Sequence, residues 1–335
     1  MSSSLKVREV FALPPIPEED SVYKLLPYGR GERYYRERTD RNIGWITPRE
    51  QDRLRHSVVG IAGCGGMGGL LAAIFARLGI GEIRIADCEV FDVSNLNRQF
   101  AATSSTIGSS KAFETARMVR AITDDMTLAV YPQGITEKTV DQFLDGCDIV
   151  CDEIEFWALG ARILLHERAC QVPIPLVNCS TVGFGTRLFL FDHTGMTMEE
   201  MVGISLGNAY VLQERISNRT ATHQEIQRVL FAMLNGLIPE LPEYHHCNSP
   251  YLSRDECMRR LRDECTAPII ATNPSLASGF LANHVLLTLL SGSDGVQSTR
   301  SIVRPPRTPG YLYFDSALMQ AKVVLREEVS NAYLN

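Results

Sequence analysis

One short glycine-rich turn limits the folds open to this chain, the sequence Gly63-Cys64-Gly65-Gly66-Met67-Gly68. It follows the apolar run 58–62, which is typical of a buried strand, and precedes the apolar run 70–76, which is typical of a helix. Glycines between a strand and a helix let the backbone approach a phosphate, and the free N–H groups of the helix start favour its negative charge. The order therefore predicts a nucleotide-binding turn, and the glycine pattern by itself suggests NAD first.

Strand-like and helix-like segments alternate from residue 58 to about residue 192. The strand that follows the turn's helix ends at Asp87, about 20 residues on, where a carboxylate can bind ribose hydroxyls. The alternation predicts an α/β fold, a doubly wound, Rossmann-like and mostly parallel sheet, with an antiparallel extension and a helical insertion. We expect strands at 58–62, 82–87, 127–131, 148–152, 176–181 and 186–191, and helices at 67–78, 110–122, 137–145 and 156–171.

Composition along the chain divides it into four expected parts. Residues 1–32 are rich in proline and turn formers and predict an extended N-terminal arm. Residues 33–195 form the core, which opens with a helix start at Thr47-Pro48-Arg49-Glu50. Residues 196–268 carry more charge and helical spacing, and predict a helical insertion. Residues 269–335 complete the core with a long helix from Pro274 and short strands near 300–303, 311–315 and 321–325.

Composition also excludes several classes of partner. A net charge of -6 argues against nucleic acid or an anionic membrane surface as the main partner. The longest apolar stretches, such as 285–290, are far shorter than a membrane span, and the N-terminus lacks the pattern of a signal peptide. Nine scattered cysteines, an odd number, are typical of reduced thiols. We therefore expect a soluble, cytoplasmic protein.

A set of polar residues beyond Asp87 does not suit an NAD site. Asn95, Arg98 and Lys111 follow in order, whereas hydride transfer needs a nicotinamide pocket and an acid or base. Attack of a carboxylate on the α-phosphate of ATP brings two anions together and needs fixed cations to stabilise the transition state. Arginine offers planar paired donors to phosphate oxygens, and lysine acts as a movable point charge. The pattern favours chemistry at a phosphate.

At these residues the sequence resembles the ThiF/MoeB adenylyltransferases and the adenylation domains of ubiquitin-activating enzymes. The resemblance rests on the glycine turn, Asn95-x-x-Arg98-Gln99 and Lys111, and it covers about residues 33–192 and the helix from 274 to 290. It implies an ATP-binding adenylation core with Asp87 on the ribose. The nucleotide would be held by Gly63, Gly65, Gly66, Gly68, Asp87, Asn95, Arg98, Gln99 and Lys111.

The resemblance also implies a partner subunit and a metal ion. The family's N-terminal arginine, which reaches into the partner's active site, is matched best by Arg41, so we expect a homodimer with Arg41 acting in trans beside the catalytic Asn95, Arg98 and Lys111. The family's Asp-x-x-Asp-Asn pattern, which binds magnesium, is matched by the sequence Asp152-Glu153-Ile154-Glu155-Phe156. Glutamate can bind a hard cation through oxygen, so we expect Glu155 as the Mg²⁺ ligand, supported by Asp152.

Cysteine usage departs from the family's sulfur-activating members, many of which bind structural zinc through two Cys-x-x-Cys pairs. This chain has no such pair, and we expect no zinc. The cluster of His245, His246, Cys247, Cys257 and Cys265 matches no known zinc spacing and favours ordinary helix and loop residues. Cys179 follows a strand and is open to two interpretations, an acyl acceptor that forms a thioester or a small buried residue.

The expected activity is ATP-dependent adenylation of a carboxylate on a peptide or small protein. The missing zinc pairs and the acidic balance favour a peptide-modifying enzyme of natural-product (antibiotic) biosynthesis, similar to those of pantocin A or microcin C, where glutamate side chains of a precursor would be activated in the pantocin type. Activation of the C-terminus of a ubiquitin-like or sulfur-carrier protein is the alternative. Two other classes stay open, an NAD-dependent oxidoreductase and a non-catalytic scaffold subunit.

Overall fold

The computed structural model describes residues 5–237, 242, 244, 254–291 and 303–325. By its contacts the chain forms two compact units. The first comprises Met1–Ile154, Ile174–Val177 and Ser278–Val303, and the second comprises Glu155–Pro173, Asn178–Ala277 and Arg304–Asn335. The glycine turn and most of the predicted site residues belong to the first unit. The four-part division expected from composition stays a prediction.

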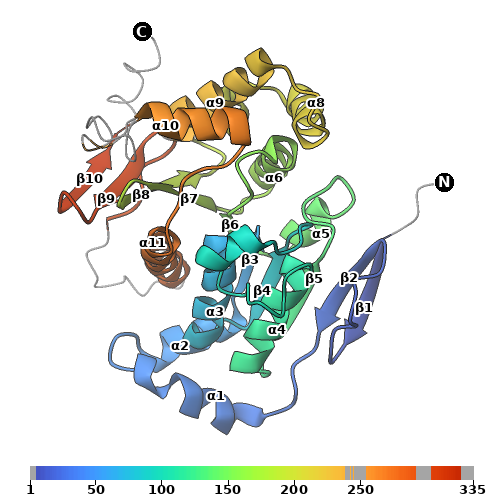
Figure 1. Cartoon of the computed structure of the whole chain (residues 1–335). Helices are drawn as coiled ribbons and strands as arrows, with labels where there is room; N and C mark the ends of the chain where they lie inside the picture. Colours follow the sequence, from blue (N-terminus) through green and yellow to red (C-terminus); the bar gives the residue numbers. More distant parts are fainter. Residues whose placement is uncertain (1–4, 238–241, 243, 245–253, 292–302, 326–335) are drawn as a thin grey trace. The chain divides into compact units, whose positions relative to one another are not determined.

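The first unit contains most of the parallel strands (Figure 1). Its strands are β1 (Lys6–Val10), β2 (Ser21–Leu25), β3 (Val58–Ala62), β4 (Glu82–Ala86), β5 (Thr127–Tyr131) and β6 (Ile149–Asp152). Its helices are α1 (Gly31–Thr39), η1 (Asp40–Asn42), α2 (Pro48–His56), α3 (Gly66–Leu78), η2 (Val93–Asn97), α4 (Lys111–Ile122) and α5 (Val140–Leu144). β7 (Leu176–Val182) and α11 (Thr272–Leu290) have residues in both units.

These strands lie in the order β1-β2-β5-β4-β3-β6. β3 is parallel to both β4 and β6, β4 is parallel to β5, and β2 runs antiparallel to β5. Because the carboxyl ends of parallel strands meet at one edge, the residues after β3 and β4 share that edge. The arrangement confirms the predicted Rossmann-like α/β fold and places the glycine turn where such folds bind ligands.

The core of the first unit follows from its apolar strands and helix faces. Ile61 on β3, Ile85 on β4 and Phe75 on α3 are fully buried, as periodic apolar residues predict. Each such side chain contributes about 1.5–3 kcal/mol through burial. The predicted helix start at Thr47 is confirmed as a capping box, because Thr47 Oγ1 accepts from Glu50 N at 3.2 Å and Glu50 Oε2 accepts from Thr47 N at 2.7 Å.

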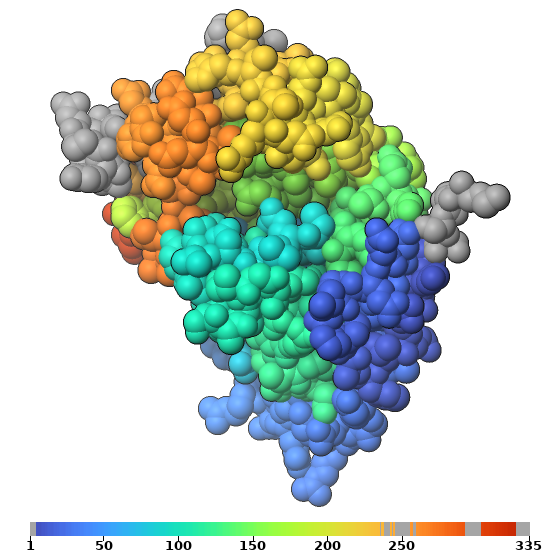
Figure 2. All heavy atoms as spheres, turned by 45° about the vertical axis from the view of Figure 1, so that its right-hand side comes forward, coloured from blue at the N-terminus to red at the C-terminus, as the bar shows by residue number. Residues whose placement is uncertain are grey.

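Within the predicted arm, two segments form strands of this sheet. β2 pairs with β5 in the register Tyr23↔Val130, and β1 pairs with β2. Figure 2 shows the dark-blue arm lying against the green part of the same unit. Polar contacts hold it there, since Lys138 Nζ lies 3.0 Å from Asp20 Oδ1 and Arg117 donates to the carbonyl oxygen of Pro14 at 2.8 Å. The sequence did not indicate these two strands, because proline and turn-forming residues flank them.

The second unit carries the antiparallel strands and the helical insertion. β8 (Gly185–Phe191), β9 (Tyr311–Asp315) and β10 (Gln320–Val324) pair antiparallel in that order. Its helices are α6 (Leu159–Gln171), α7 (Met198–Val202), α8 (Leu206–Ser217), α9 (His223–Leu237), α10 (Arg254–Arg259) and η4 (Arg260–Glu264). The strands expected at 311–315 and 321–325 are therefore present, whereas residues 300–302 lie outside the described part of the chain. Among the described helices, none is both long and apolar enough to cross a bilayer.

Candidate active site

The glycine turn has a backbone path that excludes side chains at two positions. Gly63 has φ +100°, and a Cβ there would lie 2.1 Å from the carbonyl oxygen of Glu153. A Cβ at Gly68 would lie 1.8 Å from the carbonyl oxygen of Gly63. Gly63 N also donates to Ala86 O at 2.7 Å, which ties the turn to the end of β4. The turn can form only with glycine at both places.

The helix start beside the turn is open toward a ligand. Gly65 is the N-cap of α3 and Gly66 is its first residue, and no side chain caps the first N–H groups. A Cβ at Gly65 would meet only Gln99 Nε2, at 3.8 Å, so the turn has open space on that side. Uncapped N–H groups at the start of a helix of this length attract phosphate oxygens. The cradle fits the phosphates of a nucleotide.

Asp87 lies directly after β4 and is held by two backbone amides. Its Oδ2 accepts from Cys64 N at 2.6 Å, and its Oδ1 accepts from Glu89 N at 2.8 Å. Burial raises the pKa of Asp87 to about 6, although both amides stabilise the ionised carboxylate and oppose the shift. The carboxylate is therefore fixed beside the glycine turn, at the edge where a ribose would lie in this fold.

Asn95, Arg98 and Gln99 come from the short helix η2 and the residues after it. Asn95 is buried, and its Oδ1 accepts from Asp92 N at 3.2 Å. Arg98 is half-buried and donates to Ser94 O at 3.1 Å. Gln99 is buried near Gly65, and its Oε1 has no hydrogen-bond partner among the described residues. A buried amide oxygen without a donor beside the turn is available to a ligand.

Lys111, the first residue of α4, is paired with Glu89, to which we assigned no role from the sequence. Its Nζ lies 2.6 Å from Glu89 Oε2, and its backbone N donates to Glu89 O at 2.9 Å. The Lys111 side chain is 7% exposed, whereas that of Glu89 is 52% exposed. Because Glu89 faces solvent, phosphate oxygens can compete with it for the ammonium group. The sequence signal that could have indicated this pair is Glu89 itself, an acidic residue two positions after Asp87 and just beyond the end of β4.

Arg41 lies in η1, which precedes the glycine turn in the sequence. Its side chain is exposed, and the described residues offer it no hydrogen bond or ion pair. Two apolar neighbours are also exposed, Ile43 at 43% and Trp45 at 86%. An exposed guanidinium on such a segment suits a contact with another molecule. The role of Arg41 in trans stays a prediction.

The two carboxylates expected to bind magnesium differ in exposure. Asp152 ends β6 and is fully buried, and its Oδ1 accepts from Ile154 N at 3.2 Å. Glu155 is exposed and begins the second unit. Both offer the oxygen atoms that Mg²⁺ prefers. Their role as metal ligands stays a prediction.

The described cysteines form no disulfide, and Cys64 and Cys179 are both buried. Cys64, inside the turn, is buried, and burial raises the pKa of its thiol well above the ordinary value, as expected of a packing residue. Cys179 is buried in the second unit, with its Sγ 2.8 Å from Thr186 Oγ1. This environment favours the interpretation of Cys179 as a small buried residue. His245, His246 and Cys247 lie outside the described residues.

Known proteins resemble this chain over part or most of its length. The mouse adenylyltransferase and sulfurtransferase MOCS3 is 29% identical over 203 residues, which are 58% of this chain and 43% of that protein. The tRNA threonylcarbamoyladenosine dehydratase of Bacillus subtilis is 31% identical over 128 residues, 38% of this chain and 50% of that protein. This chain therefore spans half or less of the length of these two relatives.

A solved structure shows the same fold. The crystal structure of E. coli MccB with ATP matches with a TM-score of 0.53 at 16% identity, over 85% of this chain and 70% of that one. The model of the ThiF family matches residues 39–326, which include the glycine turn, Asp87, Lys111 and the helical insertion. The chain belongs to the ThiF family.

Proposed function

We propose that this protein is an ATP-dependent adenylyltransferase that activates a carboxylate of a peptide or small protein. One observation carries the proposal, a continuous chain of contacts from the glycine turn to Lys111. Cys64 N donates to Asp87, Glu89 N donates to the same carboxylate, and Glu89 pairs with Lys111. The glycine turn, the Asp87 carboxylate and the buried ammonium group of Lys111 are thus connected by contacts at one edge of the sheet.

In the proposed reaction, a carboxylate oxygen of the substrate attacks the α-phosphorus of ATP. The new bond is the acyl–phosphate bond, and the bond from the α-phosphorus to the bridging oxygen of the β-phosphate breaks. The products are an acyl-adenylate and pyrophosphate, and the pair of electrons leaves on the pyrophosphate. Phosphate oxygens displace Glu89 from Lys111, whose ammonium group then stabilises the charge of the transition state.

Other residues complete this proposal. The amides of the glycine turn hold the phosphates, and Asp87 accepts hydrogen bonds from the ribose hydroxyls. Asn95, Arg98 and Gln99 surround the phosphates, and Arg41 of a second copy adds a cation in a homodimer. Glu155 and Asp152 would hold magnesium, which would supply positive charge against the phosphates. The absence of disulfides among the described cysteines supports a reducing, cytoplasmic location.

The substrate that we propose is a ribosomally made precursor peptide of antibiotic biosynthesis, whose glutamate side chains are activated as in the pantocin type. We propose no zinc site in the enzyme. The sequence supports this through its lack of Cys-x-x-Cys pairs and its acidic balance. A ubiquitin-like or sulfur-carrier protein is the second candidate, favoured by the likeness to a sulfur-carrier protein adenylyltransferase of Thermus thermophilus, 26% identical over 162 residues. Family membership favours both over an NAD-dependent oxidoreductase.

The test is ATP–pyrophosphate exchange with candidate peptides and carrier proteins. Lys111→Ala should lower the exchange rate by about 100-fold or more, the usual effect of removing a group that stabilises transition-state charge. Lys322→Ala, at an exposed position of β10, is the matched control and should keep the full rate. Equal exchange by both variants would refute the role of Lys111. Exchange absent with every carboxylate offered, from a folded protein, would favour a scaffold subunit.

A further inference from the structure

The surroundings of Lys111 carry three carboxylates. Glu89 Oε2 lies 2.6 Å from Lys111 Nζ, and the charge of Lys111 also acts on Asp87 and Asp92. The ammonium group itself is almost fully buried, since the Lys111 side chain is 7% exposed. Opposite charges attract strongly at a buried position, where water screens them little. Any phosphate that reaches Lys111 must therefore compete with an acid already beside it.

Two of these three carboxylates are held by other groups. Asp87 accepts from two backbone amides, and Asp92 Oδ1 accepts from Ser94 Oγ at 2.5 Å. The Glu89 carboxylate has Lys111 as its one hydrogen-bond partner in the described part of the chain, and its side chain is 52% exposed. Of the three acids, Glu89 is therefore the one that can leave Lys111 and enter solvent.

The backbone around this pair is fixed independently of the Glu89 side chain. Lys111 N donates to Glu89 O at 2.9 Å, and Glu89 N donates to Asp87 Oδ1 at 2.8 Å. Ser110, the N-cap of α4, accepts from Phe113 N at 3.4 Å, so the helix start that carries Lys111 has its own support. A substitution that changes only the Glu89 side chain thus isolates the effect of its carboxylate.

We infer that Glu89 is a built-in competitor of the phosphates of ATP, an inference that rests on the proposed function. When ATP binds, the Glu89 carboxylate moves into solvent and a phosphate oxygen takes its place beside Lys111. When pyrophosphate leaves, Glu89 pairs with Lys111 again. The buried ammonium group thus has an anion beside it at each stage, which avoids the cost of an unpaired buried charge.

This exchange weakens the binding of ATP and of pyrophosphate, and so favours release of the product. Because Glu89 acts through Lys111, it is a positioning residue. The sign of its effect distinguishes the two roles that such an acid can have. An acid that only supports Lys111 would, when removed, weaken the binding of phosphates, whereas a competitor would, when removed, strengthen it.

Calorimetric titration of the whole protein in the presence of Mg²⁺ tests this inference. The probes are ATP, inorganic pyrophosphate and adenosine, which has the ribose but no phosphate. Glu89→Gln should bind ATP and pyrophosphate about fivefold more tightly than the parent does, the size expected for a half-exposed ion pair. Adenosine should bind both proteins equally, because it does not displace Glu89.

Three further variants keep this result specific. Glu89→Asp retains a carboxylate and should bind ATP within about twofold of the parent. Glu89→Ser removes the carboxylate with a different side chain and should act in the same direction as Glu89→Gln, which keeps the test valid if the latter does not fold. Glu37→Gln makes the same change of net charge at an exposed pair with Arg33 on α1, and should leave the affinity for every probe unchanged.

Three results would overturn the inference. They are binding of ATP by Glu89→Gln that is equal to or weaker than that of the parent, a gain of affinity that extends to adenosine, and a gain of equal size in Glu37→Gln. A parent protein that binds neither ATP nor pyrophosphate would refute the proposed function together with this inference. A parent that binds ATP and exchanges pyrophosphate, with no gain in Glu89→Gln, would refute this inference alone.

Discussion

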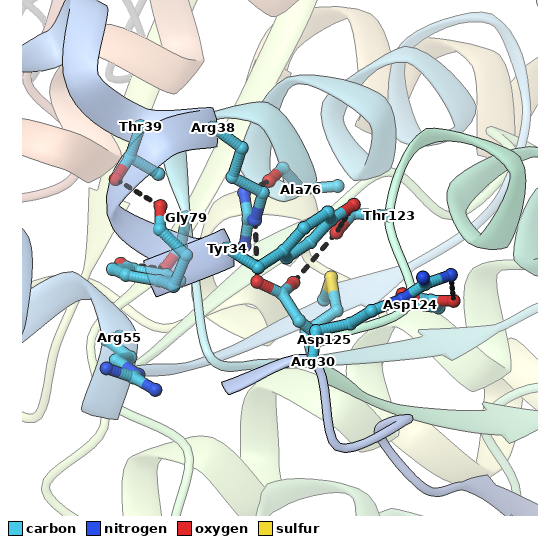
Figure 3. Close-up of polar contacts among 12 residues, drawn as sticks. Arg30, Tyr34, Arg38, Thr39, Arg55, Ala76, Gly79, Thr123, Asp124 and Asp125 are labelled. Atoms are coloured by element: carbon cyan, nitrogen blue, oxygen red, sulfur yellow. Dashed lines mark hydrogen bonds and ion pairs between the residues drawn. The ribbon is translucent and has the colours of Figure 1, made fainter. Parts of the chain in front are cut away.

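Two regions of the first unit are held in place by opposite means. The glycine turn is held by backbone hydrogen bonds and by the absence of side chains at Gly63 and Gly68. The helix α1, at the other sheet edge, is held by charged side chains (Figure 3). There Arg38 Nε lies 2.7 Å from Asp125 Oδ2, and Arg38 Nη1 donates to Ala76 O at 2.9 Å.

The difference decides what each region tolerates. At Gly63 and Gly68 the turn has no room for an added atom, whereas we expect the contact of α1 through Arg38 and Asp125 to weaken when one charge is removed. Both partners of the Arg38–Asp125 pair are buried, with side chains 14% and 7% exposed, while neighbouring Arg30 is 53% exposed in its pair with Asp124. Since α1 leads directly into η1, the buried pair also positions Arg41. Three experiments test this comparison.

The largest effect is expected from Gly63→Ala. The added Cβ meets Glu153 O at 2.1 Å on a backbone at φ +100°, so the free energy of unfolding should fall by about 4 kcal/mol or more. Urea denaturation followed by circular dichroism measures it. Gly65→Ala is the control, since its Cβ has open space, and should cost about 1 kcal/mol or less. Equal losses at both positions would contradict the steric account of the turn.

The next effect is expected from Asp125→Ala. It leaves the Arg38 guanidinium buried without its carboxylate, which should lower the free energy of unfolding by about 3 kcal/mol. Asp124→Ala removes the partner of a half-exposed arginine and should cost about 1 kcal/mol or less. Thermal or urea unfolding of the two variants gives the comparison. A smaller loss for Asp125→Ala than for Asp124→Ala would show that burial does not decide how strongly a charged pair stabilises the position of α1.

The smallest effect is expected from a change of pH, which titrates the Asp87 carboxylate beside the turn. The pKa of Asp87 is raised to about 6 from 3.8, so the native state binds this proton more tightly than the unfolded chain does. This group's contribution to the free energy of unfolding therefore falls as pH rises from about 4 to about 6 and is constant above.

The same titration should affect nucleotide affinity, since the ionised carboxylate accepts from ribose in the proposed function. The dissociation constant for MgATP, measured by calorimetry, should be about tenfold larger at pH 5 than at pH 8, because pH 5 lies about one unit below the pKa of Asp87. Asp87→Asn cannot titrate and should give a flat, weak profile. A parent protein with unchanged affinity down to pH 5 would disprove the link.

Local patterns predicted much of this molecule. The strand–turn–helix order around Gly63, the capping box at Thr47 and the strand that leads to Asp87 depend on residues a few positions apart, and the structure has all three, with the strand ending at Ala86. Apolar periodicity reports only which face of a segment is buried. It therefore identified many of the helices and strands, whereas the roles of the motif residues came from the resemblance to a known family.

Only the tertiary structure determined the long-range pairs. Arg38 and Asp125 are 87 residues apart, and the strand pairing of β2 with β5 spans a similar distance. Lys111 and Glu89 are 22 residues apart, and Arg30 and Asp124 are 94 residues apart. Such contacts depend on the path of the whole chain. The sequence by itself determined the nucleotide turn, while the packing of the chain decided which charges are paired and which are buried.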